Sequence, residues 1–410
     1  MNDDLFQVTG AAFSSVARVS LRLLMMSPKS PFLLHVVWHP GLTDGAAIAE
    51  HLREHFGGDR FQNLVGGAGV PVLFRNESQV AHGVPIPVQW DDADVVAAVV
   101  LVDHSLAGDA KWVEYLHELA NQAEARGLSK RVFPVAMETG VFGIGLQLQA
   151  LRWYTWDGDT SERQQRLHRD LSHEFSRMMR HHLEQELRNG PEGPIGAYLQ
   201  KAKVFLSHSK RDGASVASAI RDWIHQNTAL DSFMDVYDIP PGLSFEAVID
   251  ESIETGVLVA IHTDSYSSRE WCRREVIAAK RRHLPMVVVD CLHSIDERAF
   301  PYLGNVPVIR MNPCNRGRIE RVIGVLLDEV FKDYLWRCRT VGLRAVDPGV
   351  SFLSRPPELL ALATLPASGE DGTQDIVYPD PPLGVEERDL FTAIAGSVRL
   401  RALSEWLRLN

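Results

Sequence analysis

The chain has 410 residues, which is too many for one ordinary domain and suits two or three. Apolar residues make up 45% and charged residues 23%, which excludes a largely disordered chain. With 42 Lys and Arg against 53 Asp and Glu, the net charge is −11, so nothing draws the whole molecule toward nucleic-acid phosphates. No apolar run approaches the ~20 residues of a membrane helix, and the acidic start is unlike a secretory signal. We therefore expect a cytoplasmic protein with no membrane partner.

The first half alternates strand-like and helix-like patterns. The expected strands are residues 32–38, 70–75, 95–103, 131–136 and 151–156, and the expected helices are 46–56 and 112–125. Strands that alternate with helices pair in parallel, which predicts an α/β fold with a doubly wound sheet. A long amphipathic helix is predicted over residues 161–187.

A Gly- and Pro-rich linker follows, and the alternation then starts again. The expected strands are residues 203–206, 232–236, 257–262, 286–290 and 306–311, and the expected helices are 214–225, 245–253, 268–282 and 319–337. In the tail, residues 359–365 look like a strand, residues 378–384 form a Pro-rich loop, and one or two helices end the chain. We expect this tail to be too small for a core of its own and therefore to dock on something else.

These patterns give five segments. They are an N-terminal extension (1–29), a first α/β domain (30–190), a linker (191–200), a second α/β domain (201–338) and a C-terminal docking extension (339–410). The two α/β halves look like a duplication, because Asp44-Gly45-Ala46 and Asp212-Gly213-Ala214 each follow a first strand. Alignment of Trp112 on Trp271 places Leu116 opposite Glu275.

The second half carries a recognisable set of motifs. Phe205-Leu206-Ser207-His208-Ser209 ends a strand, Asp238-Ile239-Pro240-Pro241-Gly242 follows the second strand, and Trp271-Cys272-Arg273-Arg274-Glu275 opens a helix. In these motifs, residues 201–337 closely resemble a TIR (Toll/interleukin-1 receptor) domain. The resemblance implies a flavodoxin-like parallel sheet, self-association through neighbouring domains and, in many bacterial members, cleavage of NAD at the nicotinamide–ribose bond.

The resemblance makes Glu275 the catalytic residue. Cleavage of the N-glycosidic bond puts positive charge on the ribose, while nicotinamide leaves as a neutral molecule, so one carboxylate can suffice. We expect Glu275 to share a cleft-edge helix face with Trp271, one turn earlier. The alternative is a surface glutamate that pairs with a nearby Arg or Lys.

Substrate-binding residues are expected at the carboxyl ends of the strands, where backbone amides and a cation can hold a pyrophosphate. The candidates are Ser207, His208, Ser209, Lys210 and Arg211, together with Tyr266 and Trp271 as rings that would stack on a base. The alternatives are a loop in which Asp212 caps the next helix, and aromatic rings that belong to the core.

The assembly loop of the family maps to Asp238, Ile239, Pro240, Pro241 and Gly242. Its alternative is a plain strand-to-helix connection. The four cysteines contain no C-x-x-C pair, so no metal site is expected. The basic residues between 269 and 282 alternate with Glu270 and Glu275, which favours a solvated helix over a nucleic-acid groove.

Together these observations predict an NAD hydrolase that acts on NAD as substrate without a cofactor and becomes active on assembly. Its expected role is that of a bacterial anti-phage effector, switched on by an unidentified protein or nucleotide signal. The first half is interpreted as a diverged TIR-like domain without the catalytic glutamate. The alternative function is a non-catalytic TIR scaffold or adaptor for protein–protein assembly.

Overall fold

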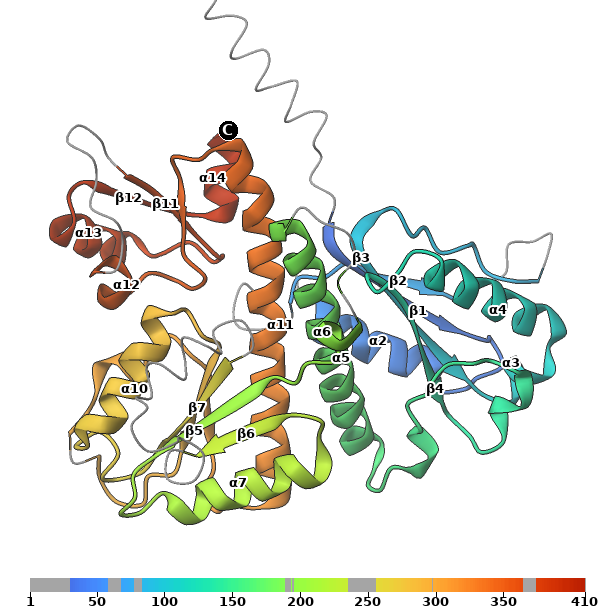
Figure 1. The fold of residues 1–410 in the computed structure, drawn as a ribbon, viewed down its shortest axis with the longest axis horizontal. Helices are drawn as coiled ribbons and strands as arrows, with labels where there is room; N and C mark the ends of the chain where they lie inside the picture. The colour runs from blue at the N-terminus through green and yellow to red at the C-terminus, as the bar shows by residue number, and fades with distance from the viewer. Residues whose placement is uncertain are drawn as a thin grey trace, which may run out of the picture.

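The computed structural model describes residues 30–57, 68–76, 83–188, 193, 195–234, 256–296, 298–363 and 374–409. Within them lie three sheets whose strand pairs are all parallel, and helices connect most of the strands (Figure 1). The predicted α/β class with parallel sheets is therefore confirmed. The N-terminal extension, the assembly loop and the helix predicted over residues 245–253 lie outside the described residues.

The first sheet has the strand order β2-β1-β3-β4. Its strands are β1 (Ser30–Trp38), β2 (Val72–Arg75), β3 (Ala93–Val102) and β4 (Lys130–Ala136), with helices α2 (Gly45–Gly57), α3 (His104–Gly108) and α4 (Ala110–Glu124). β1 and β3 are buried along almost their whole length, as strands covered on both faces require.

The second sheet has the order β6-β5-β7-β8-β9, which repeats the first and adds an edge strand. Its strands are β5 (Lys203–His208), β6 (Asp231–Met234), β7 (Gly256–His262), β8 (Met286–Asp290) and β9 (Val308–Arg310), with helices α6 (Ile195–Tyr198), α7 (Ala214–Asn227) and α10 (Glu270–Arg281). At the place of β9 the first half has one bridge, Val135 to Leu151. The strand expected over residues 151–156 is thus wrong beyond Leu151, because Trp153–Thr155 turns into a 3₁₀ helix.

Two long helices, α5 (Thr160–Arg188) and α11 (Arg316–Val346), pack side by side between the two sheets (Figure 1). One continuous apolar core joins them to the inner faces of both sheets, from Phe32 on β1 to Val204 on β5. Separate clusters fill the outer faces, under α4 in the first half and under α10 in the second. The two halves are therefore held together by a shared interior.

The C-terminal extension forms a third sheet with the order β10-β11-β12. Its elements are β10 (Ser351–Phe352), α12 (Leu359–Ala363), β11 (Gln374–Tyr378), α13 (Val385–Ile394), β12 (Val398–Ala402) and α14 (Leu403–Leu409). Residues 359–363 are helical rather than a strand, since Leu and Ala favour a helix and a short apolar run fits either state. The extension also has a small core of its own, around Ile376 and Tyr378, which corrects the expectation that it would have none.

Trp336 of α11 packs with Phe352 and Trp406 of this extension, so the extension lies against α11. Within the described part of the chain, no helix is both long and apolar enough to cross a bilayer.

Candidate active site

Glu275 lies on the inner face of α10, against the second sheet. Its exposed fraction is 3%, and Cys272, one turn earlier on the same helix, is 2% exposed. Cys272 Sγ donates to the carbonyl of His208, the last residue of β5, at 3.5 Å. The sequence predicted Glu275 either at a cleft edge or on the surface. The structure corrects both expectations, because Glu275 lies on the buried face of α10.

A chain of hydroxyl groups leads to this carboxylate. Ser207 Oγ donates to Glu275 Oε2 at 2.5 Å, and Tyr266 Oη lies 2.7 Å from Ser207 Oγ. Ser207 is 3% exposed and Tyr266 is fully buried. Burial raises the pKa of Tyr266 well above its usual value, Cys272 and Glu275 raise it further, and only the hydrogen bond with Ser207 opposes them. The phenol therefore stays protonated at neutral pH.

The two aromatic candidates occupy different environments. Trp271 is 43% exposed, and the Arg274 guanidinium lies 5.8 Å from its ring centroid. Trp271 and Glu275 therefore do not share a face of α10. Tyr266 belongs to the core cluster beneath α10. Of the two rings, only that of Trp271 is accessible to a base.

The strand-end residues also divide into buried and exposed. His208 and Ser209 are buried, and Ser209 Oγ lies 2.8 Å from Ser265 Oγ. Lys210 and Arg211 are exposed. Of the five candidates at this strand end, the two cations are therefore the ones that reach the surface.

Asp212 does not cap α7, whose N-cap is Gly213. It instead accepts hydrogen bonds from Thr263 Oγ1 and Ser265 Oγ, each at 2.7 Å. Burial raises the pKa of Asp212, but these hydrogen bonds outweigh it and hold that pKa below its usual value. Asp212 therefore ties the loop after β5 to the loop after β7.

Sequence reasoning missed one polar cluster at this edge of the sheet. His262 Nε2, at the end of β7, lies 2.9 Å from Asp296 Oδ2, and Ser267 Oγ donates to the same oxygen at 3.0 Å. His262 ends a predicted strand, which was the available signal, but nothing in the pattern links it to Asp296. The assembly loop from Asp238 to Gly242 lies outside the described residues.

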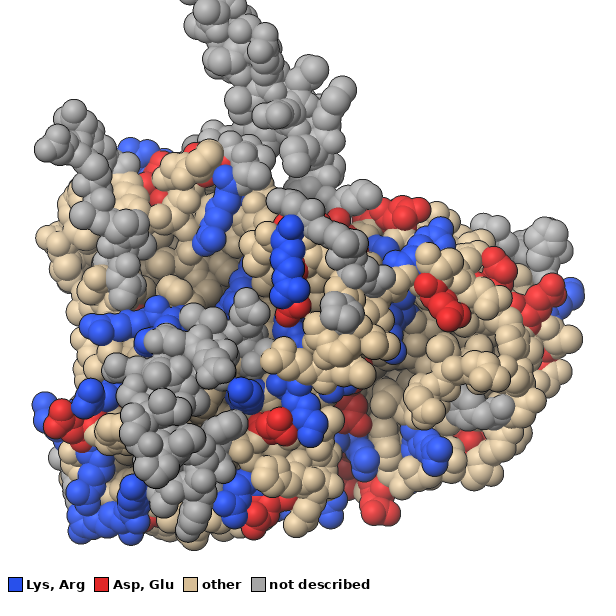
Figure 2. Space-filling model, in the orientation of Figure 1, with Lys and Arg blue, Asp and Glu red and all other residues tan. Residues whose placement is uncertain are grey.

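Two basic residues of α10 have partners on the protein itself, because Arg273 donates to the carbonyl of Ser267 and Lys280 to Glu358. Over the whole face drawn in Figure 2, Lys and Arg are interspersed with Asp and Glu. No set of three or more His, Cys, Asp or Glu side chains suited to a metal ion occurs among the described residues.

The first half has a different residue at the position of Glu275. The N-caps of α4 and α10 are Asp109 and Arg269, and counting from them puts Tyr115, not Leu116, at the place of Glu275. Leu116 is 1% exposed and instead matches Val276. The alignment on tryptophan was one residue out, because Trp112 is buried where Trp271 is exposed.

Comparisons with known proteins find a family match within the second half. Residues 204–320 match the family model described as the TIR domain. No curated protein matches the chain.

Two solved structures are similar to parts of the chain. One, of TIR domains in the activated Roq1 resistosome that directly recognises the pathogen effector XopQ, is 20% identical over 22% of this chain and 58% of that one, with a TM-score of 0.20. The other, tagatose-6-phosphate ketose/aldose isomerase from Escherichia coli, is 11% identical over 80% of this chain and 88% of that one, with a TM-score of 0.19. TM-scores this low establish no common fold over the chain. On the family match, the second half of this protein contains a TIR domain, over residues 204–320.

Proposed function

We propose that this protein hydrolyses NAD at the nicotinamide–ribose bond, with Glu275 as the catalytic residue and NAD as a substrate rather than a cofactor. The observation that carries the proposal is a carboxylate held by Ser207 at the carboxyl end of β5, the edge where open parallel sheets bind ligands. The TIR family match covers this residue. A carboxylate there would stabilise the ribosyl cation as the neutral nicotinamide departs.

Activity would depend on assembly. Because Glu275 is 3% exposed, NAD can reach it only after a rearrangement around α10. We propose that self-association through the loop 238–242, triggered by a protein or nucleotide signal, produces that rearrangement. The first half would serve as a diverged TIR-like partner for assembly or sensing, and the whole would act as a bacterial anti-phage effector in the cytoplasm.

The burial of Glu275 also favours a second function, that of a non-catalytic TIR scaffold. In that case the Ser207–Glu275 hydrogen bond is purely structural, and the protein recruits partners without turnover. The two functions differ in one measurable product, free nicotinamide.

The test compares wild type with Glu275→Gln, each incubated with NAD in dilute and in crowded solution. We expect wild type to release nicotinamide under crowding, and Glu275→Gln to lose about a hundredfold or more in rate while remaining folded. Glu270→Gln is the matched control, because Glu270 is an exposed acid on the same helix, and its rate should equal that of wild type. Absence of nicotinamide release by assembled wild type would favour the scaffold, whereas an undiminished rate in Glu275→Gln would show that Glu275 is not the catalytic residue.

A further inference from the structure

Building on the proposed function, we infer that Ser207 and Tyr266 are positioning residues for Glu275 and not substrate-binding residues. They form a buried relay in which the Tyr266 hydroxyl donates to Ser207 and the Ser207 hydroxyl donates to the Glu275 carboxylate. Ser207 acts on the reaction only through Glu275, and Tyr266 only through Ser207.

The chemistry of the groups fixes the direction of this relay. An ionised carboxylate only accepts, and a serine hydroxyl has one proton to donate and two lone pairs that accept. Once the Ser207 hydroxyl donates its one hydrogen bond to Glu275, it can only accept a hydrogen bond from Tyr266. Tyr266 is a permanent donor, because burial keeps its phenol protonated.

A buried carboxylate needs such donors to stay charged. Removal from water favours the neutral form of an acid, and hydrogen bonds donated to the ionised form oppose that effect. Glu275 is 3% exposed, so the Ser207 proton supports the charge that the proposed reaction requires. The same bond fixes the carboxylate plane, and the contact from Cys272 to the His208 carbonyl holds α10 on β5 beside it.

The first half shows that these three residues are replaced together. Val37 and Ser207 are the next-to-last residues of β1 and β5 and pair with Val100 and Ala260. Leu106 and Tyr266 stand at the same distance after β3 and β7 and are both fully buried.

With Tyr115 in place of the glutamate, the first half therefore has neither the carboxylate nor either hydroxyl. With no carboxylate to hold, the first half needs neither hydroxyl, which agrees with a shared task for the three groups.

The decisive experiment is a double-mutant cycle in the full chain, measured under crowding with NAD. Ser207→Ala should lower kcat about 10- to 100-fold, the worth of one hydrogen bond to a charged group, with little change in KM. Ser207→Thr, which keeps the hydroxyl, should recover most of the rate. The acid limb of the pH–rate profile should move up by about one pH unit in Ser207→Ala.

Tyr266→Phe should lower kcat less than Ser207→Ala does, and the double variant should be no slower than Ser207→Ala alone. The inference would be overturned if the losses in kcat of the two single variants add in the double variant. It would also be overturned if Ser207→Ala raises KM instead of lowering kcat, or leaves the pH–rate profile unmoved. Ser172→Ala is the matched control, since Ser172 is a fully buried serine that donates to another carboxylate, that of Asp328, at 2.7 Å. It should lower the melting temperature and leave kcat and the pH profile unchanged.

A second arm needs no turnover and so separates this inference from the proposed function. The melting temperature lost in Ser207→Ala should be smaller at low pH, where Glu275 is protonated, than at high pH, where it is ionised, because Ser207 supports the ionised carboxylate. In a Glu275→Gln background the loss should not vary with pH. If the loss of melting temperature is independent of pH in both backgrounds, the relay is overturned, even if NAD cleavage itself is confirmed. A loss that depends on pH only when Glu275 is present would uphold the relay, even if wild type cleaves no NAD.

Discussion

His35 is a titratable residue that lies buried in the middle of β1. It is fully buried, and neither ring nitrogen has a hydrogen-bond partner among the described residues. Burial, with a smaller contribution from Arg75, lowers its pKa from 6.5 to about 3. The unfolded chain therefore takes up a proton near pH 6.5, while the folded chain does not until about pH 3.

This difference predicts acid instability. Between those pH values, His35 lowers the free energy of unfolding by ~1.4 kcal/mol for each pH unit by which the pH falls. His35→Leu should therefore be more stable than wild type by ~2 kcal/mol at pH 5 relative to pH 7, measured by urea unfolding at both values. His51→Gln, at a half-exposed histidine, should leave the wild-type slope as it is. Equal slopes in wild type and His35→Leu would contradict the assignment.

At the same scale, the sequence pointed to a candidate carboxylate but not to how it is held. The motif from Trp271 to Glu275 pointed to the carboxylate, yet the four-residue spacing was taken as a shared face. The structure shows that the inward face follows Cys272 and Glu275, while Trp271 points outward. Ser207 and Tyr266 were candidates because one lies at the end of a strand and the other shortly after one. Their contact with Glu275 joins three separate segments of the chain, and no local sequence pattern predicts such a contact.

Among the elements, the helix pair α5 and α11 joins the two halves of the chain. Phe331 of α11 is 1% exposed and lies 5.8 Å from Phe175 of α5 and 5.2 Å from Phe32 of β1, centroid to centroid. A side chain of the second half thus completes the core of the first. Polar contacts from His55 and Ser172 to Asp328 fix the register of the helices.

Phe331→Ala should therefore destabilise the chain by about 3–5 kcal/mol and split its unfolding. We expect calorimetry to show two transitions, because the first half loses part of its core while the second keeps its outer cluster. Phe300→Ala is the control, since Phe300 packs only within the outer cluster of the second half. It should lower stability without splitting the transition, and a single transition in Phe331→Ala would argue against a shared core.

At this scale the sequence predicted most strands and helices, because buried parallel strands are continuous apolar runs and long helices carry clear stripes. It failed at residues 151–156 and 359–365. Short apolar segments fit a strand, a turn or a helix equally well, and only their tertiary neighbours decide among these states. For the same reason, no pattern predicted that α5 and α11 would lie side by side.

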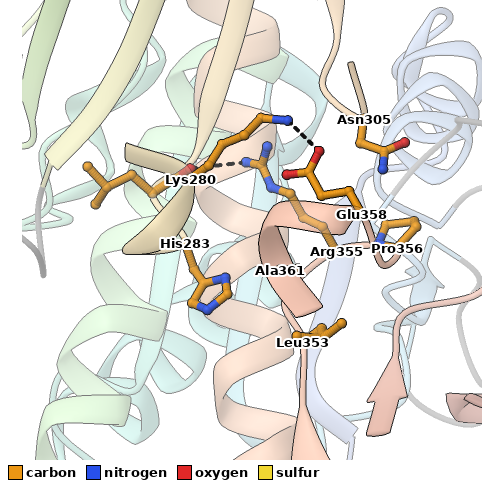
Figure 3. Close-up of a pocket in the computed structure, with 9 residues that line it drawn as sticks. Lys280, His283, Asn305, Leu353, Arg355, Pro356, Glu358 and Ala361 are labelled. Atoms are coloured by element: carbon orange, nitrogen blue, oxygen red, sulfur yellow. Dashed lines mark hydrogen bonds and ion pairs between the residues drawn. The ribbon is translucent and has the colours of Figure 1, made fainter. Parts of the chain in front are cut away.

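Across the whole molecule, the C-terminal extension is fastened to the helix that carries Glu275. Lys280 of α10 has a side chain only 6% exposed, and its Nζ lies 2.7 Å from Glu358 Oε2 and 2.7 Å from the carbonyl of Gly304. Figure 3 shows Lys280 and Glu358 pointing at each other and in contact in the lining of a small cavity, with Arg355 beside them. Burial lowers the pKa of Lys280, and Glu358 partly restores it.

Removal of one partner should therefore cost more than removal of both. Glu358→Gln leaves a buried ammonium group without its counter-charge, so we expect a loss of about 1–3 kcal/mol and faster cleavage of the extension by added protease. The double variant Lys280→Met with Glu358→Leu should regain most of that stability, because a well-packed apolar pair replaces a buried ion pair at little cost. Glu386→Gln, at an exposed acid in the first turn of α13, should behave as wild type. If Glu358→Gln resists protease as wild type does, the ion pair does not fasten the extension, and its other contacts, including the apolar ones around Trp336, hold it in place.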